Sequence, residues 1–223
     1  MEQTARYDGL ADWYDSEFNP RSLSGAAWEL VTSFLGRGPG RLLDLGCGTG
    51  TYAAGLAECG WNVTGVDISE DMLRRARAKD IRVIRTDAAT LPFEDASFDA
   101  AVSALTHTDF DDFAGAVREV ARVLERAARF VYVGVHPCFV GPHSEFAFAR
   151  GTPTLHDGWY RRAGRYDDAP GISPHGVRAK IGATHLPLGA FVQTFLDAGF
   201  MVERFAEAGE FEYPHLVALR LRN

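Results

Sequence analysis

Three closely spaced glycines stand where the backbone could lie against a ligand. Residues 42–50 read LLDLGCGTG, so Gly46, Gly48 and Gly50 follow a short apolar strand and precede a predicted helix. Glycine at such a turn allows a tight bend and leaves room for a ligand beside the backbone. The next predicted strand ends at Asp67, about 20 residues further on, where a carboxylate can accept hydrogen bonds from both hydroxyls of a ribose. The spacing predicts a site for a ligand that contains a ribose.

The pattern of glycines also disfavours other sites. The dinucleotide fingerprint is GxGxxG, whereas this turn reads GxGxG, and the chain contains no Gly-Lys-Ser or Gly-Lys-Thr of a phosphate-binding loop. Cys47, Cys59 and Cys138 form no CxxC pair, and the histidine spacings fit no compact metal-binding motif. No metal site is therefore predicted.

Two histidines are candidates for catalytic acid–base chemistry. His107 follows the fourth predicted strand and His136 ends the fifth, and ligands of open α/β sheets bind beyond the carboxyl ends of the strands. Because imidazole titrates near neutral pH, either side chain could take a proton from an acceptor. A structural hydrogen-bonding role is the alternative for each. The nearby acidic residues Asp109, Asp111 and Asp112 are adequately explained by a solvated helix N-terminus.

Strands and helices alternate along the part of the chain that must position these residues. The N-terminal stretch to about residue 35 is expected to form a helical cap. The predicted strands are 41–45, 61–66, 81–85, 98–103 and 130–135, and the helices between them are 51–59, 69–78 and 111–124. A last helix is followed by two more strands, at 188–198, 201–205 and 215–220. This order predicts an α/β fold with a seven-stranded mostly parallel sheet, helices on both faces and an antiparallel C-terminal hairpin.

Residues 136–187 interrupt the alternation. They are rich in glycine, proline, histidine and aromatic residues and show little periodicity, and so long a connection is unusual within a compact domain. Because this insert leaves the fifth strand at its carboxyl end, we expect a lid on the substrate side, with a rigid dimerisation arm as the alternative. The chain is accordingly interpreted as one domain, 1–223, with a helical cap at 1–35 and this insert at 136–187.

Three motifs in order make the prediction more specific. LLDLGCGTG at 42–50, VTGVDIS at 63–69 and RTDAATLPFEDASFDAAVS at 85–103 resemble the class I, Rossmann-like S-adenosylmethionine-dependent methyltransferases, in the style of bacterial small-molecule and quinone-pathway enzymes. The resemblance extends over about residues 5–135 and again over the terminal helix and hairpin. It implies a methyltransferase domain, S-adenosyl-L-methionine as cofactor, and an oxygen, nitrogen or carbon acceptor on a small molecule.

The resemblance also assigns roles to single residues. Asp44 would lie near the ammonium group of the cofactor, Asp67 would hold the ribose hydroxyls, and Asp87 would accept from the adenine amine. Tyr14 would close over the cofactor, with core packing as the alternative, and Cys47 is expected to pack rather than react. The full set implied to bind the cofactor is Tyr14, Asp44, Gly46, Cys47, Gly48, Gly50, Asp67, Ile68, Met72, Asp87, Ala88 and Leu105.

One turn departs from the family pattern. Pro-Gly-Gly usually precedes the fifth strand, whereas this chain has Glu-Arg-Ala-Ala at 125–128. The turn is expected at the end of the sheet opposite the cofactor. The departure from Pro-Gly-Gly is therefore expected to affect the geometry and stability of this turn and not the chemistry at the cofactor.

Composition narrows the classes of function and location. The formal net charge of −7 argues against a nucleic-acid partner. The N-terminal MEQTARYDGLADWYD lacks the apolar core of a signal peptide, and no apolar run approaches about 18 residues, so a cytoplasmic protein without a membrane span is predicted, as a monomer or homodimer. The alternatives to a methyltransferase are a non-catalytic S-adenosylmethionine-binding regulatory module and, less favoured, an NAD-dependent oxidoreductase.

Overall fold

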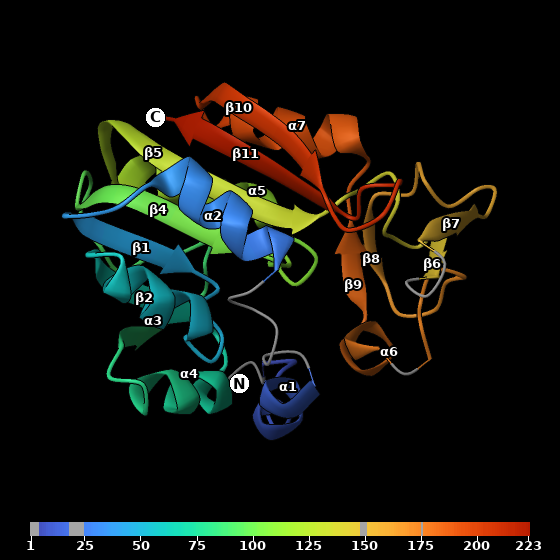
Figure 1. The fold of residues 1–223 in the computed structure, drawn as a ribbon, viewed down its shortest axis with the longest axis horizontal. Coiled ribbons are helices and arrows are strands. Elements are labelled where there is room, and N and C mark those ends of the chain that lie inside the picture. Colours follow the sequence, from blue (N-terminus) through green and yellow to red (C-terminus); the bar gives the residue numbers. More distant parts are fainter. Residues whose placement is uncertain (1–4, 18–24, 148–150, 175) are drawn as a thin grey trace.

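The apolar runs of the sequence form the strands of one sheet. The structure is a computed structural model that describes residues 5–17, 25–147, 151–174 and 176–223. Within these residues, seven strands lie in the order β10-β11-β5-β4-β1-β2-β3 (Figure 1). Their bounds are β1 Arg41–Leu45, β2 Asn62–Asp67, β3 Arg82–Arg85, β4 Phe98–Ala104, β5 Leu124–Val135, β10 Met201–Ala208 and β11 Leu216–Arg222.

The direction of the strands follows from the connections between them. β1 to β5 are parallel to one another, because each connection crosses back through a helix or a long loop. β11 lies between β5 and β10 and runs antiparallel to both. The predicted α/β class, with a mostly parallel sheet and an antiparallel C-terminal pair, is confirmed.

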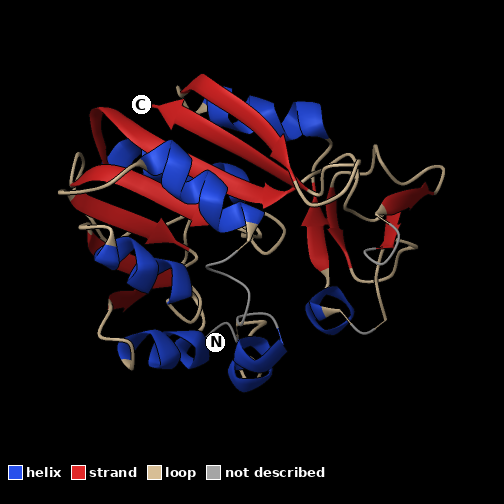
Figure 2. Ribbon diagram, in the orientation of Figure 1, coloured by secondary structure: helices blue, strands red, loops and turns tan. Residues whose placement is uncertain are grey.

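Helices cover both faces of the sheet (Figure 2). Phe34 of α2 and Leu56 of α3 are buried in the core on one face, and Phe113 of α5 and Phe191 of α7 are buried in the core on the other. Burial of apolar side chains on two faces of one sheet is the main stabilising contribution in such a fold. The helices of this body are α1 Ala11–Glu17, α2 Ala26–Leu35, α3 Thr51–Glu58, α4 Glu70–Arg77, α5 Phe113–Val123 and α7 Leu188–Asp197.

The insert forms a lobe beside the carboxyl ends of the central strands (Figure 1). Its strands β6 and β7 make one antiparallel pair and β8 and β9 another, and among the described residues of the insert one short helix, α6, precedes β9. Strands of three or four residues are too short to show a clear alternation of apolar residues, so the sequence predicted no elements here. The elements are β6 Ser144–Ala147, β7 Thr152–Leu155, β8 Gly164–Tyr166, α6 Val177–Ile181 and β9 Ala183–His185.

The departure from Pro-Gly-Gly becomes a bulge inside a longer strand. β5 begins at Leu124 rather than at the predicted residue 130, and its register against β4 shifts between Phe98 and Ala100. Ala127 takes a positive φ of 63°, a conformation that favours glycine. Its N–H donates to the carbonyl of Asn223 at 3.0 Å, which holds the bulge against the end of β11.

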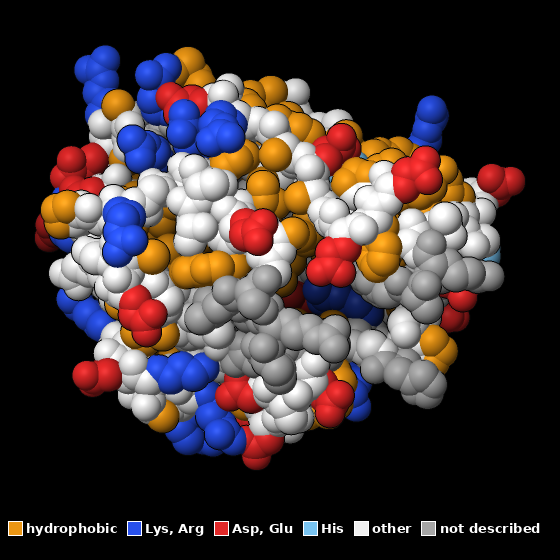
Figure 3. Space-filling model, viewed as in Figure 1, with side chains coloured by type: hydrophobic (Ala, Val, Ile, Leu, Met, Phe, Trp, Pro, Cys, Tyr) orange, Lys and Arg blue, Asp and Glu red, His pale blue; other side chains and the backbone are white. Residues whose placement is uncertain are grey.

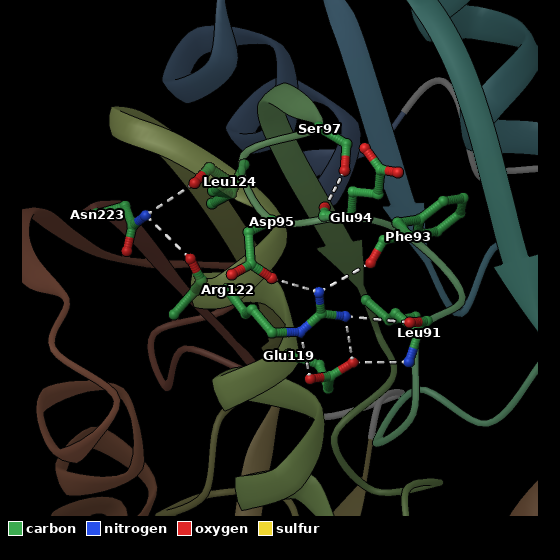
Figure 4. Close-up of polar contacts among 10 residues, drawn as sticks. Leu91, Phe93, Glu94, Asp95, Ser97, Glu119, Arg122, Leu124 and Asn223 are labelled. Atoms are coloured by element: carbon green, nitrogen blue, oxygen red, sulfur yellow. Dashed lines mark hydrogen bonds and ion pairs between the residues drawn. The ribbon is translucent and has the colours of Figure 1, made fainter.

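The same end of the sheet anchors the loop between β3 and β4. Arg122 of α5 donates to the carbonyls of Phe93 (2.8 Å) and Leu91 (3.1 Å) and to the carboxylates of Glu119 and Asp95, both at 2.8 Å (Figure 4). Glu119 in turn accepts from the N–H of Leu91 at 2.8 Å. Charge-assisted bonds on both sides of one guanidinium fix this loop, which begins with the motif residues 87 and 88.

Candidate active site

A cavity of about 190 Å³ lies beyond the carboxyl ends of β1, β2 and β4, where ligands of open α/β sheets bind. Most residues that the sequence implied for the cofactor line it together. These are Tyr14, Gly46, Gly48, Asp67, Ile68, Met72, Asp87, Ala88 and Leu105. The remaining wall comes from the N-terminal segment, from the ends of β2, β3 and β4 and from the segment after β4, with Ala5, Arg6, Tyr7, Val66, Thr86, Ala104, Thr106, Asp109, Phe110 and Asp111.

Asp67 organises the glycine turn. Its two carboxylate oxygens accept from the N–H groups of Gly48 and Ser69, each at 2.9 Å. Burial raises the pKa of Asp67, and the hydrogen bonds from these backbone N–H groups make that rise smaller. Gly48 has a φ of 52°, and a Cβ on it would meet nothing within 4 Å, so the turn leaves open space there. At Gly46 a Cβ would lie 2.7 Å from the Cγ2 atom of Thr106, so glycine is required.

The helix after Asp67 begins as the sequence predicted. Ser69 caps α4, because its side-chain oxygen accepts from the N–H of Met72 at 3.3 Å. The cap places Met72 in the first turn, where its buried side chain forms part of the cavity wall. Asp87 also lines the cavity, and its carboxylate accepts from the N–H of Ala89 at 2.9 Å.

Asp44 lies behind the cavity wall rather than in it. Its side chain is buried, and its Oδ2 atom has no hydrogen-bond partner among the described residues. Burial, followed by repulsion from Asp67, raises the pKa of Asp44 to about 7. An orphaned buried carboxylate behind a glycine turn fits a positively charged ligand group, such as the ammonium group that the resemblance implies.

Two other implied residues have packing roles in the structure. Gly50 has a φ of 76°, and a Cβ on it would lie 2.8 Å from the Cβ of Ala76, so it lets α3 and α4 approach. Cys47 is buried, and its sulfur would lie 2.7 Å from a Cβ on Gly65 in β2. Neither residue lines the cavity, and burial raises the pKa of the Cys47 thiol, which keeps it in its unreactive protonated form.

The N-terminal segment is tied down across the cavity. The Ser69 hydroxyl donates to Asp8 at 2.6 Å, and the N–H of Gly9 donates to Asp71 at 2.9 Å. These contacts bring Tyr7 and Tyr14 to the cavity wall, where their rings meet edge to face with centroids 5.7 Å apart. Burial raises the pKa of Tyr14 to about 12, so both hydroxyls remain protonated hydrogen-bond donors.

The segment after β4 brings an acidic side chain that the sequence interpretation had placed in solvent. Leu105 takes a φ of 61°, a strained conformation for a residue with a side chain, and it turns the chain sharply at the cavity. Asp109 then lines the cavity, with its side chain only 20% exposed, and accepts from the Tyr7 hydroxyl at 3.3 Å. Asp112, by contrast, is the N-cap of α5, as a helix N-terminus predicts.

The two histidines proposed for acid–base chemistry lie outside the cavity wall. His107 is buried among aromatic rings, its Nδ1 atom is hydrogen-bonded to the Tyr132 hydroxyl, and burial lowers its pKa to about 3. His136 is also buried, with its Nε2 atom 2.6 Å from Glu207 and its Nδ1 atom accepting from the N–H of Cys138 at 3.1 Å. One ring nitrogen of His107 and both ring nitrogens of His136 are thus hydrogen-bonded within the protein, as in a structural role.

A second missed residue comes from the insert. The guanidinium of Arg178 in α6 forms an ion pair with Asp109 and also donates to the Thr108 hydroxyl at 2.5 Å. Burial disfavours the charged guanidinium, but Asp109 beside it raises the pKa of Arg178. No local pattern in the sequence links positions 109 and 178, because they are joined only by the tertiary fold.

Among the described residues, no three histidine, cysteine or acidic side chains are grouped so that they could hold a metal ion. No helix in the same ranges combines the length and the apolar character needed to cross a membrane.

Comparisons with known proteins agree with this geometry. Residues 43–132 match the family model for a methyltransferase domain. A demethylmenaquinone methyltransferase of Corynebacterium kroppenstedtii is 34% identical over 119 residues, which is 52% of each chain. This chain spans about half the length of the curated relatives it matches.

Solved structures resemble nearly the whole chain. An S-adenosylmethionine-dependent methyltransferase from Mesorhizobium loti superimposes with a TM-score of 0.75 and 26% identity, over 91% of this chain and 100% of that one. The cyclase SpnF shares the fold with a TM-score of 0.63 and 18% identity, over 87% of this chain and 78% of that one. Residues 43–132 thus match a methyltransferase domain, and nearly the whole chain has the fold of the S-adenosylmethionine-dependent methyltransferases.

Proposed function

We propose that this protein transfers a methyl group from S-adenosyl-L-methionine to a small-molecule acceptor. The observation that carries the proposal is the single cavity wall shared by the glycine turn, Asp67 and Asp87. Asp67 would hold the ribose, Asp87 and Ala88 the adenine, and Asp44 the ammonium group. The bound cofactor supplies a methyl group already activated by a sulfonium, so the protein has to position the acceptor and remove its proton.

The acceptor side of the cavity is proposed to lie between the N-terminal segment and the segment after β4. Tyr7, Thr106 and Phe110 line it with two acidic residues, Asp109 and Asp111, of which Asp109 has the less exposed side chain, at 20% against 58%. The Asp109 carboxylate would take the proton that a hydroxyl or amine acceptor loses, while the Tyr7 hydroxyl orients the acceptor. The structural alternative is favoured for both histidines, because Nδ1 of His107 and both ring nitrogens of His136 are hydrogen-bonded within the protein.

A small aromatic or quinol-like molecule is the acceptor class that we propose to test first. The matched relatives include several demethylmenaquinone methyltransferases, and the cavity presents Tyr7, Tyr14 and Phe110 to a flat ring. The formal charge of −7 disfavours nucleic acid as the acceptor. A cytoplasmic location and a monomeric or homodimeric state belong to the same proposal.

The proposal is tested by incubating the protein with S-adenosylmethionine and a reduced short-chain demethylmenaquinone, followed by a panel of phenols, carboxylic acids and amines. We expect S-adenosylhomocysteine and a methylated acceptor in equal amounts by mass spectrometry. Asp109→Asn should lower turnover by about 10²-fold or more, the usual contribution of a positioned proton acceptor. A greater loss in His107→Asn or His136→Gln would instead assign the base to a histidine.

A non-catalytic or differently catalytic S-adenosylmethionine-binding protein is the second candidate. The specific observation in its favour is that a cyclase shares this fold, so the fold alone does not determine the reaction. S-adenosylmethionine that binds but stays intact with every acceptor in the panel would favour this candidate.

A further inference from the structure

A side chain of the lobe formed by the insert contacts an acidic residue of the cavity wall. Arg178 is the second residue of α6, and its guanidinium contacts Asp109 and Thr108 in the segment after β4. The side chain is 23% exposed, and the surface between the sheet and the lobe is hollowed, with Lys or Arg atoms on the floor of the hollow (Figure 3). A cation from the lobe therefore lies beside the acidic group of the acceptor side.

Backbone contacts hold the two segments in register around this ion pair. The N–H of Thr184 in β9 donates to the carbonyl of Thr108 at 2.7 Å, and its hydroxyl donates to the carbonyl of Phe110 at 3.2 Å. These bonds lie on either side of Asp109 in the sequence. The position of Arg178 relative to the carboxylate is thus fixed by the fold and does not depend on a flexible surface pair.

The two carboxylate oxygens of Asp109 have different partners. Oδ1 faces Arg178, whereas Oδ2 is 3.3 Å from the hydroxyl of Tyr7, a residue of the cavity wall. Arg6 approaches from the same side as Tyr7, but donates to the backbone carbonyl of Asp109 at 2.9 Å and to the carboxylate of Asp111. Of the described cations, Arg178 is therefore the one that engages the Asp109 carboxylate itself.

We propose that Arg178 is a positioning residue: it holds one oxygen of Asp109 so that the other is presented to Tyr7 and the acceptor. The insert would then complete the acceptor side of the site and would not merely cover it. This inference rests on the proposed function, since it concerns the same cavity. It requires that Arg178 act through Asp109, so losses at the two positions should not add.

The test compares Arg178→Gln, Arg178→Lys, Asp109→Asn and the double variant Asp109→Asn/Arg178→Gln. Arg165→Gln is the matched control, because Arg165 belongs to the same lobe and donates to the carbonyl of Ile181 without contacting Asp109. We expect Arg178→Gln to lower kcat about 10-fold to 10²-fold, as a misplaced catalytic group does, with the KM for S-adenosylmethionine within about threefold. Arg178→Lys should recover part of the loss, and Arg165→Gln should show none.

In the Asp109→Asn background, Arg178→Gln should cost less than about twofold. Losses that simply multiply, or an equal loss in Arg165→Gln, would show that Arg178 only supports the lobe and would overturn the inference. Crystal structures with S-adenosylhomocysteine give a readout that needs no turnover. The Asp109 side chain should leave Tyr7 in Arg178→Gln, and an unchanged Asp109–Tyr7 contact would equally overturn the inference.

These outcomes are separate from those of the proposed function. A wild-type protein that binds S-adenosylhomocysteine but methylates no acceptor contradicts the proposed function, and the crystallographic comparison still decides the role of Arg178. If the wild-type protein methylates an acceptor and Arg178→Gln methylates it equally well, only the positioning role is contradicted.

Discussion

The two sides of the cavity are held in different ways. Asp67, on the proposed cofactor side, is fixed by backbone N–H groups of its own motif, from Gly48 and Ser69 at 2.9 Å. Asp109, on the proposed acceptor side, is fixed by side chains that are distant in sequence, Tyr7 from the N-terminal segment and Arg178 from the insert. Backbone contacts depend on the sheet, whereas the side-chain contacts depend on two segments that pack around it.

This difference indicates which substitutions should alter cofactor binding and which should alter turnover. Parallel strands that end at one edge bring the residues proposed to bind the cofactor together whenever the sheet forms. The proposed acceptor side would need the sheet, the N-terminal segment and the lobe at once. Changes in the lobe should therefore alter turnover while leaving cofactor binding nearly intact.

The largest expected effect comes from shortening the lobe. Gly171 donates its N–H to the carbonyl of Pro142 at 3.0 Å, so the two residues are neighbours and residues 143–170 can be removed between them. The deletion removes β6, β7 and β8, including the partner strand of β9, and so unsettles the helix that carries Arg178. We expect turnover to be lost and the affinity for S-adenosylhomocysteine to change by no more than about threefold.

Calorimetry, a turnover assay and size-exclusion chromatography on the shortened protein check this expectation. Circular dichroism provides the control that the sheet still folds. Normal turnover would contradict a role of the lobe on the acceptor side, and a change only from dimer to monomer would identify the lobe as a dimerisation arm.

A pH-dependent effect on stability is expected at Asp44, on the cofactor side. Its pKa is raised to about 7 by burial, above the unfolded value near 3.8, so the ligand-free folded state favours the protonated acid. The stability that this proton contributes is present below about pH 4 and is lost as the pH rises to about 7. Asp44→Asn, which mimics the protonated form, should therefore stabilise the ligand-free protein at pH 8 by about 2–4 kcal/mol.

Urea unfolding of both proteins at pH 8, 6 and 4 measures this difference, which should shrink steadily as the pH falls. Wild-type protein should also gain affinity for S-adenosylhomocysteine as Asp44 ionises near pH 7, and Asp44→Asn should not. A stability difference that is the same at all three pH values would contradict the raised pKa of Asp44.

The smallest expected effect is at the bulge in β5, away from the cavity. Ala127 has a φ of 63°, which costs a residue with a Cβ about 1–2 kcal/mol, whereas glycine adopts it freely but loses more entropy on folding. Ala127→Gly should therefore stabilise the protein by about 0.5–1 kcal/mol. Ala128→Gly is the matched control, because Ala128 is buried without a positive φ and should destabilise. Thermal unfolding of the two variants decides between strain relief and a general effect of glycine.

The same contrast between the two sides explains what the sequence could predict. The glycine turn, Asp67 and the Ser69 cap follow local rules of backbone conformation, and each lies where the motif order indicates. Asp109 was assigned to a solvated helix end because it stands in an acidic run, yet only Asp112 of that run caps the helix. Nothing local distinguishes two aspartates three positions apart when one of them is held by a distant arginine.

The histidines illustrate the same limit from the other direction. Their places at the ends of β4 and β5 were correct, but the direction of each side chain depends on its tertiary neighbours. His107 points into a cluster of aromatic rings on the α5 and α7 side, and His136 meets Glu207 of β10. The strands of the lobe lay beyond prediction for a related reason, since three or four residues are too few positions to show a pattern.

Calorimetric titration of the wild-type protein and Asp67→Ala with S-adenosylhomocysteine and with NAD tests the central claim most directly. We predict that the wild-type protein binds S-adenosylhomocysteine and does not bind NAD. Asp67→Ala should stay folded and lose at least about tenfold in affinity, because charge-assisted hydrogen bonds to the ribose are worth about 1.5–3 kcal/mol each. Binding of NAD without binding of S-adenosylhomocysteine, or unchanged affinity in a folded Asp67→Ala protein, would contradict the assignment of this cavity to the cofactor.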